Sequence, residues 1–290
     1  MLYLEWISES LIIPPIVAAL VILSIHAYLG LHVIGRGVIF VDLAFAQIAA
    51  LGSTVALLMG IEMGTTPSLL FALGFTLLGA LLFSFTRMGK SLVPQEAIIG
   101  ISYVVASAAV ILIAGFTAEG AEHLRETMTG TLIWVGWSDI AKMAAVYAGL
   151  GVFHFVLRKR FLTATFDPEN AGNVRMSDFL FYLSFGTMIS FSVEIAGVLM
   201  VFSALVIPAV IAFLYTHLFG RALLIAWAAG TVAIMGGIGT SFYLDIATGP
   251  LLVCAFGVVL VIAAGLRPLL GIRPQGKVIV RNLGGDGPEG

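Results

Sequence analysis

Two carboxylates lie within or beside apolar stretches of this chain, where an ionised side chain is costly and is usually retained for function. Asp42 follows Arg36 by six residues, which is about 9 Å along a helix. Asp42 could bind a cation, or it could form a structural ion pair with Arg36. Glu194 could line the entrance to a path or cap a helix end. Gln47 could line the same path or form an interhelical hydrogen bond.

The five histidines do not form a recognisable metal-binding pattern. His26 and His32 lie six residues apart in one apolar segment, on different helical faces. Glu119, His123 and Glu126 have helical spacings that place them on one face. That cluster could attract cations, although a solvated acidic loop is the simpler interpretation. No His-Glu-x-x-His motif occurs, which argues against an intramembrane zinc enzyme.

The composition indicates that most of the protein's surface faces lipid. Hydrophobic residues make up 60% of the 290 residues and charged residues 10%, with a mean hydropathy of +1.10. A soluble domain of this size needs far more charge. A lone cysteine, Cys254, excludes a disulfide framework within one chain. The acidic N-terminus, with Glu5 and Glu9, lacks the basic region of a cleaved signal peptide, so we expect the first apolar segment to be retained.

The apolar segments predict an all-α polytopic membrane protein. A helix needs about 20 apolar residues to cross about 30 Å of hydrocarbon. The stretch 179–216 would measure roughly 55 Å as one helix, so we expect two segments that meet near Glu194. The prediction is about nine spans, or eight if one of that pair is re-entrant. They form one domain over 1–270, followed by a flexible cytoplasmic tail, 271–290. The other segments are 12–33, 38–59, 68–85, 97–116, 140–157, 223–243 and 249–266.

The basic residues predict the orientation. Only Arg125 and Lys142 among the 14 Lys and Arg residues lie in loops on one side of the membrane. Cytoplasmic loops carry the excess of Lys and Arg, so the N-terminus should be outside and the C-terminus in the cytoplasm, which requires an odd number of spans. The residues on the cytoplasmic side are Arg36, Arg87, Lys90, Arg158, Lys159, Arg160, Arg175, Arg221, Arg267, Arg273, Lys277 and Arg281.

The longest cytoplasmic loop, residues 158–178, contains a helix-start signal. Asp167 is a good N-cap, and Pro168 occupies the position that opens a helix. A short helix here, flanked by basic residues, could dock a soluble partner. The alternative is an ordinary surface loop.

Four segments, in order along the chain, resemble the permease subunits of the ABC-3 family, the ATP-driven importers of zinc, manganese and iron. They are residues 36–42, which enter the second span, the loop segment 166–171, the Gly-x-Leu to Ile-Pro-Ala stretch 196–209, and the segment 239–250, which ends in Gly-Pro. The resemblance therefore extends from residue 36 to residue 250. The signature residues within it are Gly197, Ala204, Pro208, Asp245, Gly249 and Pro250.

The resemblance implies an inner-membrane homodimer with the path at the dimer axis. A separate ATPase would bind below it and an extracytoplasmic metal-binding protein above it. The coupling segment that seats in the ATPase would comprise Phe166, Asp167, Pro168, Glu169 and Ala171. The chain has no Gly-x-x-x-x-Gly-Lys-Ser/Thr loop, so ATP hydrolysis is expected on the other subunit and this chain should not be an enzyme. No permanent cofactor and no nucleic-acid partner are expected; the divalent metal is cargo.

The chain departs from the family at one position. The family often has a histidine four residues after the acid that Asp42 matches, a pair suited to zinc or manganese, but this chain has Ala46 there. We assign Asp42, Gln47 and Glu194 to the path. The missing histidine leaves open a permease for another small substrate. A stand-alone carrier or channel is the third alternative, although such carriers often show inverted repeats and paired intramembrane charges, which are not evident here.

Overall fold

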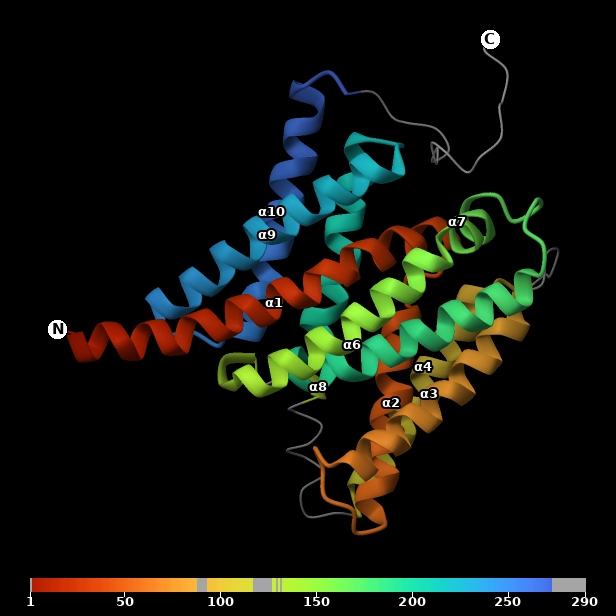
Figure 1. Cartoon of the computed structure of the whole chain (residues 1–290), viewed down its shortest axis with the longest axis horizontal. Helices are drawn as coiled ribbons and strands as arrows, with labels where there is room; N and C mark the ends of the chain where they lie inside the picture. Colours follow the sequence, from red (N-terminus) through yellow and green to blue (C-terminus); the bar gives the residue numbers. More distant parts are fainter. Residues whose placement is uncertain (1, 88–92, 117–126, 129, 131, 273–290) are drawn as a thin grey trace.

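The structure is a computed structural model that describes residues 2–87, 93–116, 127–128, 130 and 132–272, and side chains from residue 12 onward. Helices account for all the regular structure in these residues, and no strand occurs among them. The helices are α1 (Leu2–Arg36), α2 (Val41–Leu58), α3 (Thr66–Thr86), α4 (Gln95–Ala114), the 3₁₀ turn η1 (Leu132–Trp134), α6 (Trp137–Val156), α7 (Arg158–Phe166), α8 (Val174–Tyr215), α9 (Phe219–Leu244) and α10 (Thr248–Leu269) (Figure 1).

The prediction of an all-α polytopic membrane protein is confirmed. Within the described residues, eight helices are long and apolar enough to cross a membrane: α1 to α4, α6, and α8 to α10. Each apolar segment predicted from the sequence coincides with one of these helices or with a part of α8.

Helix α8 is two helices joined at a break. It spans 42 residues, but Gly197 has φ 74° and ψ 159°, which is not helical. This backbone region is accessible essentially only to glycine. Counting the two halves of α8 separately turns the eight helices into nine apolar segments. The halves run in different directions in Figure 1, and they meet three residues beyond Glu194, the predicted meeting point.

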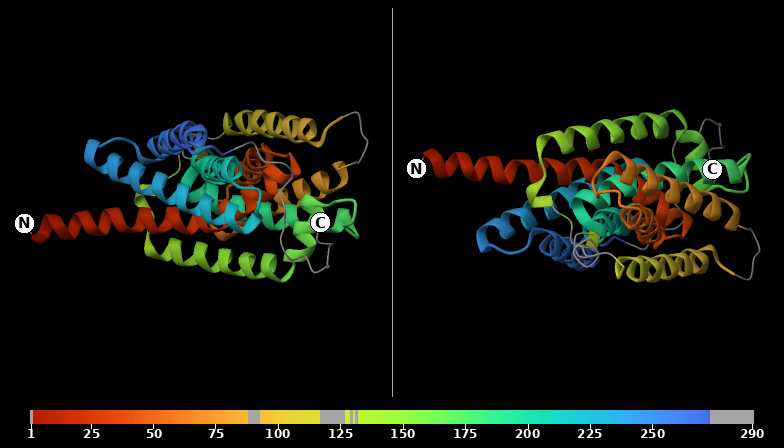
Figure 2. Two further views of the ribbon diagram at one scale, coloured as in Figure 1. Left: turned by 90° about the horizontal axis from the view of Figure 1, so that it is seen from above. Right: turned by 90° about the horizontal axis from the view of Figure 1, so that it is seen from below.

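The fold is organised around α8, which packs against α1, α2, α3, α6, α7, α9 and α10. The largest fully buried side chains include Phe45, Phe83, Phe181, Tyr182 and Phe185, where α2, α3 and α8 meet. Helices α4 and α6 lie on opposite outer faces of the bundle (Figure 2). Both expose large apolar side chains such as Ile101 and Val152, as lipid-facing helices do.

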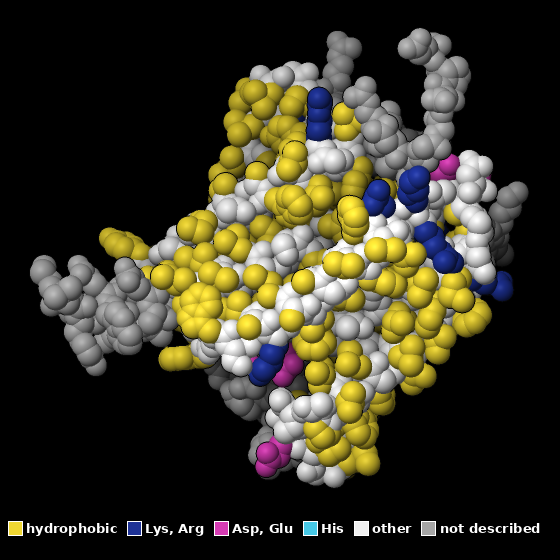
Figure 3. Space-filling view, in the orientation of Figure 1, with side chains coloured by type: hydrophobic (Ala, Val, Ile, Leu, Met, Phe, Trp, Pro, Cys, Tyr) yellow, Lys and Arg dark blue, Asp and Glu magenta, His cyan; other side chains and the backbone are white. Residues whose placement is uncertain are grey.

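The loop 158–178 differs from its prediction. Helix α7 ends at Phe166, and Asp167 is its C-cap rather than the N-cap of a new helix. A residue before proline is disfavoured in the helical conformation, so Pro168 ends α7 instead of opening a helix. The next helix, α8, starts after Asn173, whose side chain accepts a hydrogen bond from the Met176 N–H at 3.0 Å. Lys and Arg side chains gather mainly on the α7 side of the face in Figure 3, while apolar side chains cover its middle.

Candidate functional site

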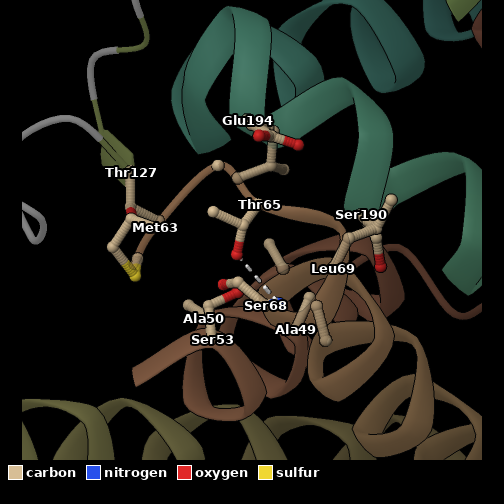
Figure 4. Close-up of a pocket in the computed structure, with 14 residues that line it drawn as sticks. Ala49, Ala50, Ser53, Met63, Thr65, Ser68, Leu69, Thr127, Ser190 and Glu194 are labelled. Atoms are coloured by element: carbon tan, nitrogen blue, oxygen red, sulfur yellow. Dashed lines mark hydrogen bonds between the residues drawn. The ribbon is translucent and has the colours of Figure 1, made fainter. Parts of the chain in front are cut away.

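A cavity of about 330 Å³ lies between α2, α3 and the two turns of α8 that precede its break at Gly197. Helix α2 contributes small side chains at helical spacing, so that they share one face. Glu194 and Ser190 are one turn apart on α8; Glu194 lies next to Thr65 at the α2–α3 connection, and Ser190 lies nearer to Leu69 of α3 (Figure 4). Its lining residues are Ala46, Ala49, Ala50, Ser53, Met63, Gly64, Thr65, Ser68, Leu69, Ala72, Thr127, Ser190, Val193 and Glu194.

The hydroxyl groups of this cavity are held by local helix geometry. Thr65 is the N-cap of α3 and accepts a hydrogen bond from the Ser68 N–H at 3.5 Å, while its own hydroxyl donates to the Glu62 carbonyl at 2.7 Å. Ser190 donates to the Gly186 carbonyl at 2.9 Å. Serine and threonine hydroxyls bound to the preceding turn keep lone pairs free to accept further bonds. The polar groups of the cavity are therefore mainly neutral hydroxyl oxygens, which lie among apolar side chains.

Glu194 also borders a second cavity of about 410 Å³ that shares Gly64, Thr65 and Leu69 with the first. This second cavity extends to η1 and the start of α6, where Lys142 donates to Asp139 at 3.3 Å. Glu194 is exposed, so its carboxylate is accessible from both cavities. It is the only carboxylate among the described residues that line the first cavity.

Asp42 does not line either cavity. It lies in the first turn of α2, 2% exposed, and accepts a hydrogen bond from the Leu43 N–H at 2.8 Å. Ala46, one turn further along α2, does line the first cavity. Gln47 is equally buried, and its side-chain Nε2 has no hydrogen-bond partner within the described part of the chain. Asp42 and Gln47 are thus buried close to the cavity along α2 but do not line it.

The alternative pairing of Asp42 with Arg36 is wrong. Arg36 donates through Nη1 to Asp178 Oδ1 at 2.5 Å, and Arg87 Nη1 donates to the same oxygen at 3.0 Å. Asp178 is fully buried. It lies in the first turns of α8, where the sequence shows only the end of a charged loop, so its role was not predicted. No feature of the sequence marks Asp178 as a buried carboxylate.

Three of the described histidines lie in hydrogen-bonded aromatic packing. His26, His32 and His154 are buried. One ring nitrogen of each forms a hydrogen bond of 2.7–2.8 Å; the partners are, in that order, the Ile22 carbonyl, the Thr165 hydroxyl and the Ser184 hydroxyl. The ring of Tyr28 lies 4.8 Å from that of His32 and 5.5 Å from that of His154. Among the described residues, no group of three or more His, Cys, Asp and Glu side chains could hold a metal ion. The cluster of Glu119, His123 and Glu126 lies outside the described residues.

The signature residues occupy structural positions. Gly197 makes the break in α8, Ala204 is fully buried, and the ring of Pro208 removes the N–H that would bond to the carbonyl of Ala204. Asp245 caps the end of α9 in the left-handed conformation, with φ 53°. Gly249 and Pro250 lie in the first turn of α10, where a proline is tolerated.

Replacing Gly197 with alanine should therefore destabilise the protein. Alanine cannot adopt φ 74° with ψ 159° without strain of about 1–3 kcal/mol. We expect the midpoint of thermal unfolding in detergent to fall by several degrees. Gly236→Ala is the matched control, because Gly236 is inside α9 and a Cβ there would meet nothing within 4 Å. Equal unfolding midpoints for Gly197→Ala and Gly236→Ala would contradict the claim that the break in α8 requires glycine at residue 197.

The predicted coupling segment follows α7 directly. Phe166 is half-buried, with its ring 5.8 Å from those of His32 and Phe219. Asp167, Pro168 and Glu169 are exposed, and Asn170 holds the carboxylate of Asp167 through two hydrogen bonds of 3.0 and 2.9 Å. Ala171 is half-buried. The segment is thus an anchored aromatic side chain followed by an exposed acidic turn.

Comparison with known proteins identifies the family. The model of the ABC 3 transport family matches residues 8–266 of the chain. The chain belongs to the ABC 3 transport family. It is similar to a probable iron transport system membrane protein of Haemophilus influenzae, with 26% identity over 77% of this chain and 81% of that one. It is also similar to the manganese transport system membrane protein MntC of Listeria innocua, with 23% identity over 94% of this chain and 96% of that one.

A solved structure has the same fold. PsaBC from Streptococcus pneumoniae in complex with Fab superposes with a TM-score of 0.74 and 20% identity, covering 90% of this chain and 95% of that chain. Membership in the ABC 3 family confirms the resemblance drawn from the four segments. The chain is a multi-pass protein of the inner membrane and a transport subunit rather than an enzyme.

Proposed function

We propose that this ABC 3 family member is the permease of an importer that moves a divalent transition metal into the cytoplasm, with ATP hydrolysed on a separate ATPase subunit. Family membership carries the proposal, because relatives that match most of this chain are named as iron and manganese transport system membrane proteins. A homodimer, a cytoplasmic ATPase and an extracytoplasmic metal-binding protein complete the assembly.

The proposed orientation puts the N-terminus outside and the C-terminus in the cytoplasm, as the basic residues favour. Helix α2 then runs outward from Arg36, so the two cavities next to Glu194 open toward the outer side. The 167–171 turn lies at the cytoplasmic side, where the ATPase binds. Cargo entry and ATPase docking are thereby assigned to opposite ends of the bundle.

The path begins in the first cavity and continues past Ala46 to Asp42, one turn deeper along α2; Gln47, the neighbour of Ala46, contributes a polar side chain at the level of the cavity. A metal ion with six water ligands occupies roughly 200 Å³, at about 30 Å³ per water. The cavity of about 330 Å³ accommodates such an ion. We assign the first encounter with cargo to Glu194 and the deeper step to Asp42.

The cavity chemistry favours manganese over zinc. Carboxylate, hydroxyl and water oxygens suit manganese, whereas zinc prefers imidazole and thiolate ligands. The described lining residues supply hydroxyls, a carboxylate and the thioether of Met63, but no imidazole or thiol. Iron is the other candidate, because it also appears among the relatives.

Asp42→Asn should abolish metal transport while the permease still assembles with its ATPase. The change keeps the shape of a side chain that is 2% exposed and removes the carboxyl group that could bind a cation in the proposed path. Metal uptake by the reconstituted complex is the measurement, and co-purification of the ATPase is the control for assembly. Normal uptake by the variant would remove Asp42 from the mechanism.

Metal-stimulated ATP hydrolysis tests the function itself. The reconstituted permease, ATPase and binding protein should hydrolyse ATP faster with manganese than with zinc or without metal. Ala46, where the family often has a histidine, keeps a permease for another small substrate as the second candidate. If manganese, zinc and iron all fail to stimulate hydrolysis, the metal assignment is wrong and the second candidate is favoured.

A further inference from the structure

A buried charged cluster joins the predicted coupling segment to the membrane helices. Asp178 accepts from both Arg36 and Arg87 through one oxygen, Oδ1. The side chains of Arg36 and Asp178 are 1% and 0% exposed, and that of Arg87 is 21% exposed. The guanidinium of Arg36 also lies 3.9 Å above the ring of Phe181. Three elements, the ends of α1 and α3 and the start of α8, therefore meet at a single carboxylate.

Helix α7 is tied to the same cluster through Thr165. The Thr165 hydroxyl accepts from Arg36 Nε at 3.0 Å and lies 2.8 Å from His32 Nδ1. A second connection is made by Arg160 Nε, which donates to the Ser177 hydroxyl of α8 at 2.8 Å. Thr165 is two residues before Asp167, where the exposed turn begins. A displacement of that turn would therefore act directly on Arg36.

Phe166 adds a steric connection to the end of α1. A Cβ built on Gly35 would lie 2.4 Å from Phe166 Cε1, so the aromatic ring occupies the space that a side chain at residue 35 would need. The ring also packs against Phe219, the first residue of α9. The end of α7 cannot shift without moving α1 or α9, because this contact leaves no gap.

Stability alone does not account for the cluster. Two arginines share one carboxylate, so its charges do not balance, and Arg36 Nη2 and Asp178 Oδ2 have no hydrogen-bond partner in the described part of the chain. Apolar residues often replace buried ion pairs with no loss of stability, whereas such pairs can fix one relative position of the elements they join. An incompletely satisfied cluster also has bonds to gain in a second arrangement.

We propose that Arg36, Arg87, Asp178 and Thr165 form a positioning joint that transmits movement of the 167–171 turn to α1, α3 and α8. The proposal rests on the proposed function, since it requires an ATPase that moves this turn. The four residues are positioning residues, because they act through the helices they join and do not contact cargo in the cavity.

Asp178→Asn tests the joint in the full complex of permease, ATPase and binding protein. The asparagine keeps the size of the side chain and removes the charge that holds both arginines. We expect ATPase co-purification and basal ATP hydrolysis to stay within about twofold of wild type. The amount of manganese transported per ATP hydrolysed should fall about tenfold. A merely structural role would lower thermal stability and leave that ratio unchanged in the surviving complexes.

Two further variants make the test decisive. Glu62→Gln removes an exposed carboxylate outside both cavities and should leave the ratio of manganese transported to ATP hydrolysed unchanged. Thr165→Val removes only the hydroxyl that bonds Arg36, and should lower the ratio about threefold even if Asp178→Asn does not assemble. A wild-type ratio in either Asp178→Asn or Thr165→Val, whichever of them assembles, would overturn the joint, as would loss of ATPase binding by folded Asp178→Asn. Absence of metal transport by the wild-type complex would instead contradict the proposed function.

Discussion

Glu194→Gln is expected to reduce metal transport by at least about tenfold at subsaturating metal. A divalent cation about 5 Å from a carboxylate gains roughly 3 kcal/mol at an effective dielectric constant of about 40, and every 1.4 kcal/mol corresponds to about tenfold in binding. Glu194 is exposed and borders both cavities, so its charge acts on a cation in either one. The measurement is the initial rate of manganese uptake at several concentrations.

The dependence of uptake on metal concentration tests whether Glu194 attracts the cation at the entrance. If the carboxylate attracts the cation at the entrance, the loss should be largest at low metal and should shrink toward saturation. Glu62→Gln, which removes an exposed carboxylate from the connection between α2 and α3 without touching either cavity, should transport at the wild-type rate. Equal uptake by the two variants at all concentrations would contradict the assignment of the cavity to the path.

Glu169→Arg should weaken binding of the ATPase by about tenfold or more. Glu169 is exposed on the turn after α7, and reversing a charge in a charge-complementary interface places like charges together, which costs several kcal/mol. The affinity of the ATPase for the permease in lipid nanodiscs is the measurement. The effect should decrease with added salt, because exposed charges are screened.

The control for this prediction lies at the other end of the bundle. Glu62→Arg makes the same change on the connection between α2 and α3, which the proposed orientation places outside the cell. ATPase affinity should be unaltered in that variant. A loss of affinity with Glu62→Arg but not with Glu169→Arg would reverse the assigned orientation.

The sequence predicted the membrane segments well, because each is a nearly continuous apolar run that only lipid can accommodate. It predicted a break in the long stretch near Glu194, and the break lies at Gly197. A charged residue in an apolar run marks an interruption, but the backbone turns at the nearest residue that tolerates a positive φ. The break was thus predictable to within one helical turn.

The loop prediction failed where two signals compete. Asp167 followed by Pro168 is a helix start when nothing helical precedes it, but here the helical residues 158–166 come first. In that setting the same pair ends a helix. Whether Asp167 and Pro168 start or end a helix therefore depends on the helical residues that come before them.

Arg36 shows why the polar contacts could not be predicted. Its partner was sought in Asp42, six residues away, whereas it pairs with Asp178, 142 residues away. A single sequence contains no information on which distant charge a buried arginine will meet. The cavity is equally hidden, because most of its lining residues are small or carry a hydroxyl, and such residues are common throughout membrane helices.

Manganese uptake into sealed proteoliposomes tests the central claim most directly. The vesicles would contain the permease and its ATPase, with ATP confined to the side that carries the 167–171 turn and the loaded binding protein on the other side. The account predicts that manganese accumulates on the ATP side and that accumulation stops without hydrolysable ATP. Accumulation on the opposite side, or ATP hydrolysis without any metal movement, would contradict it.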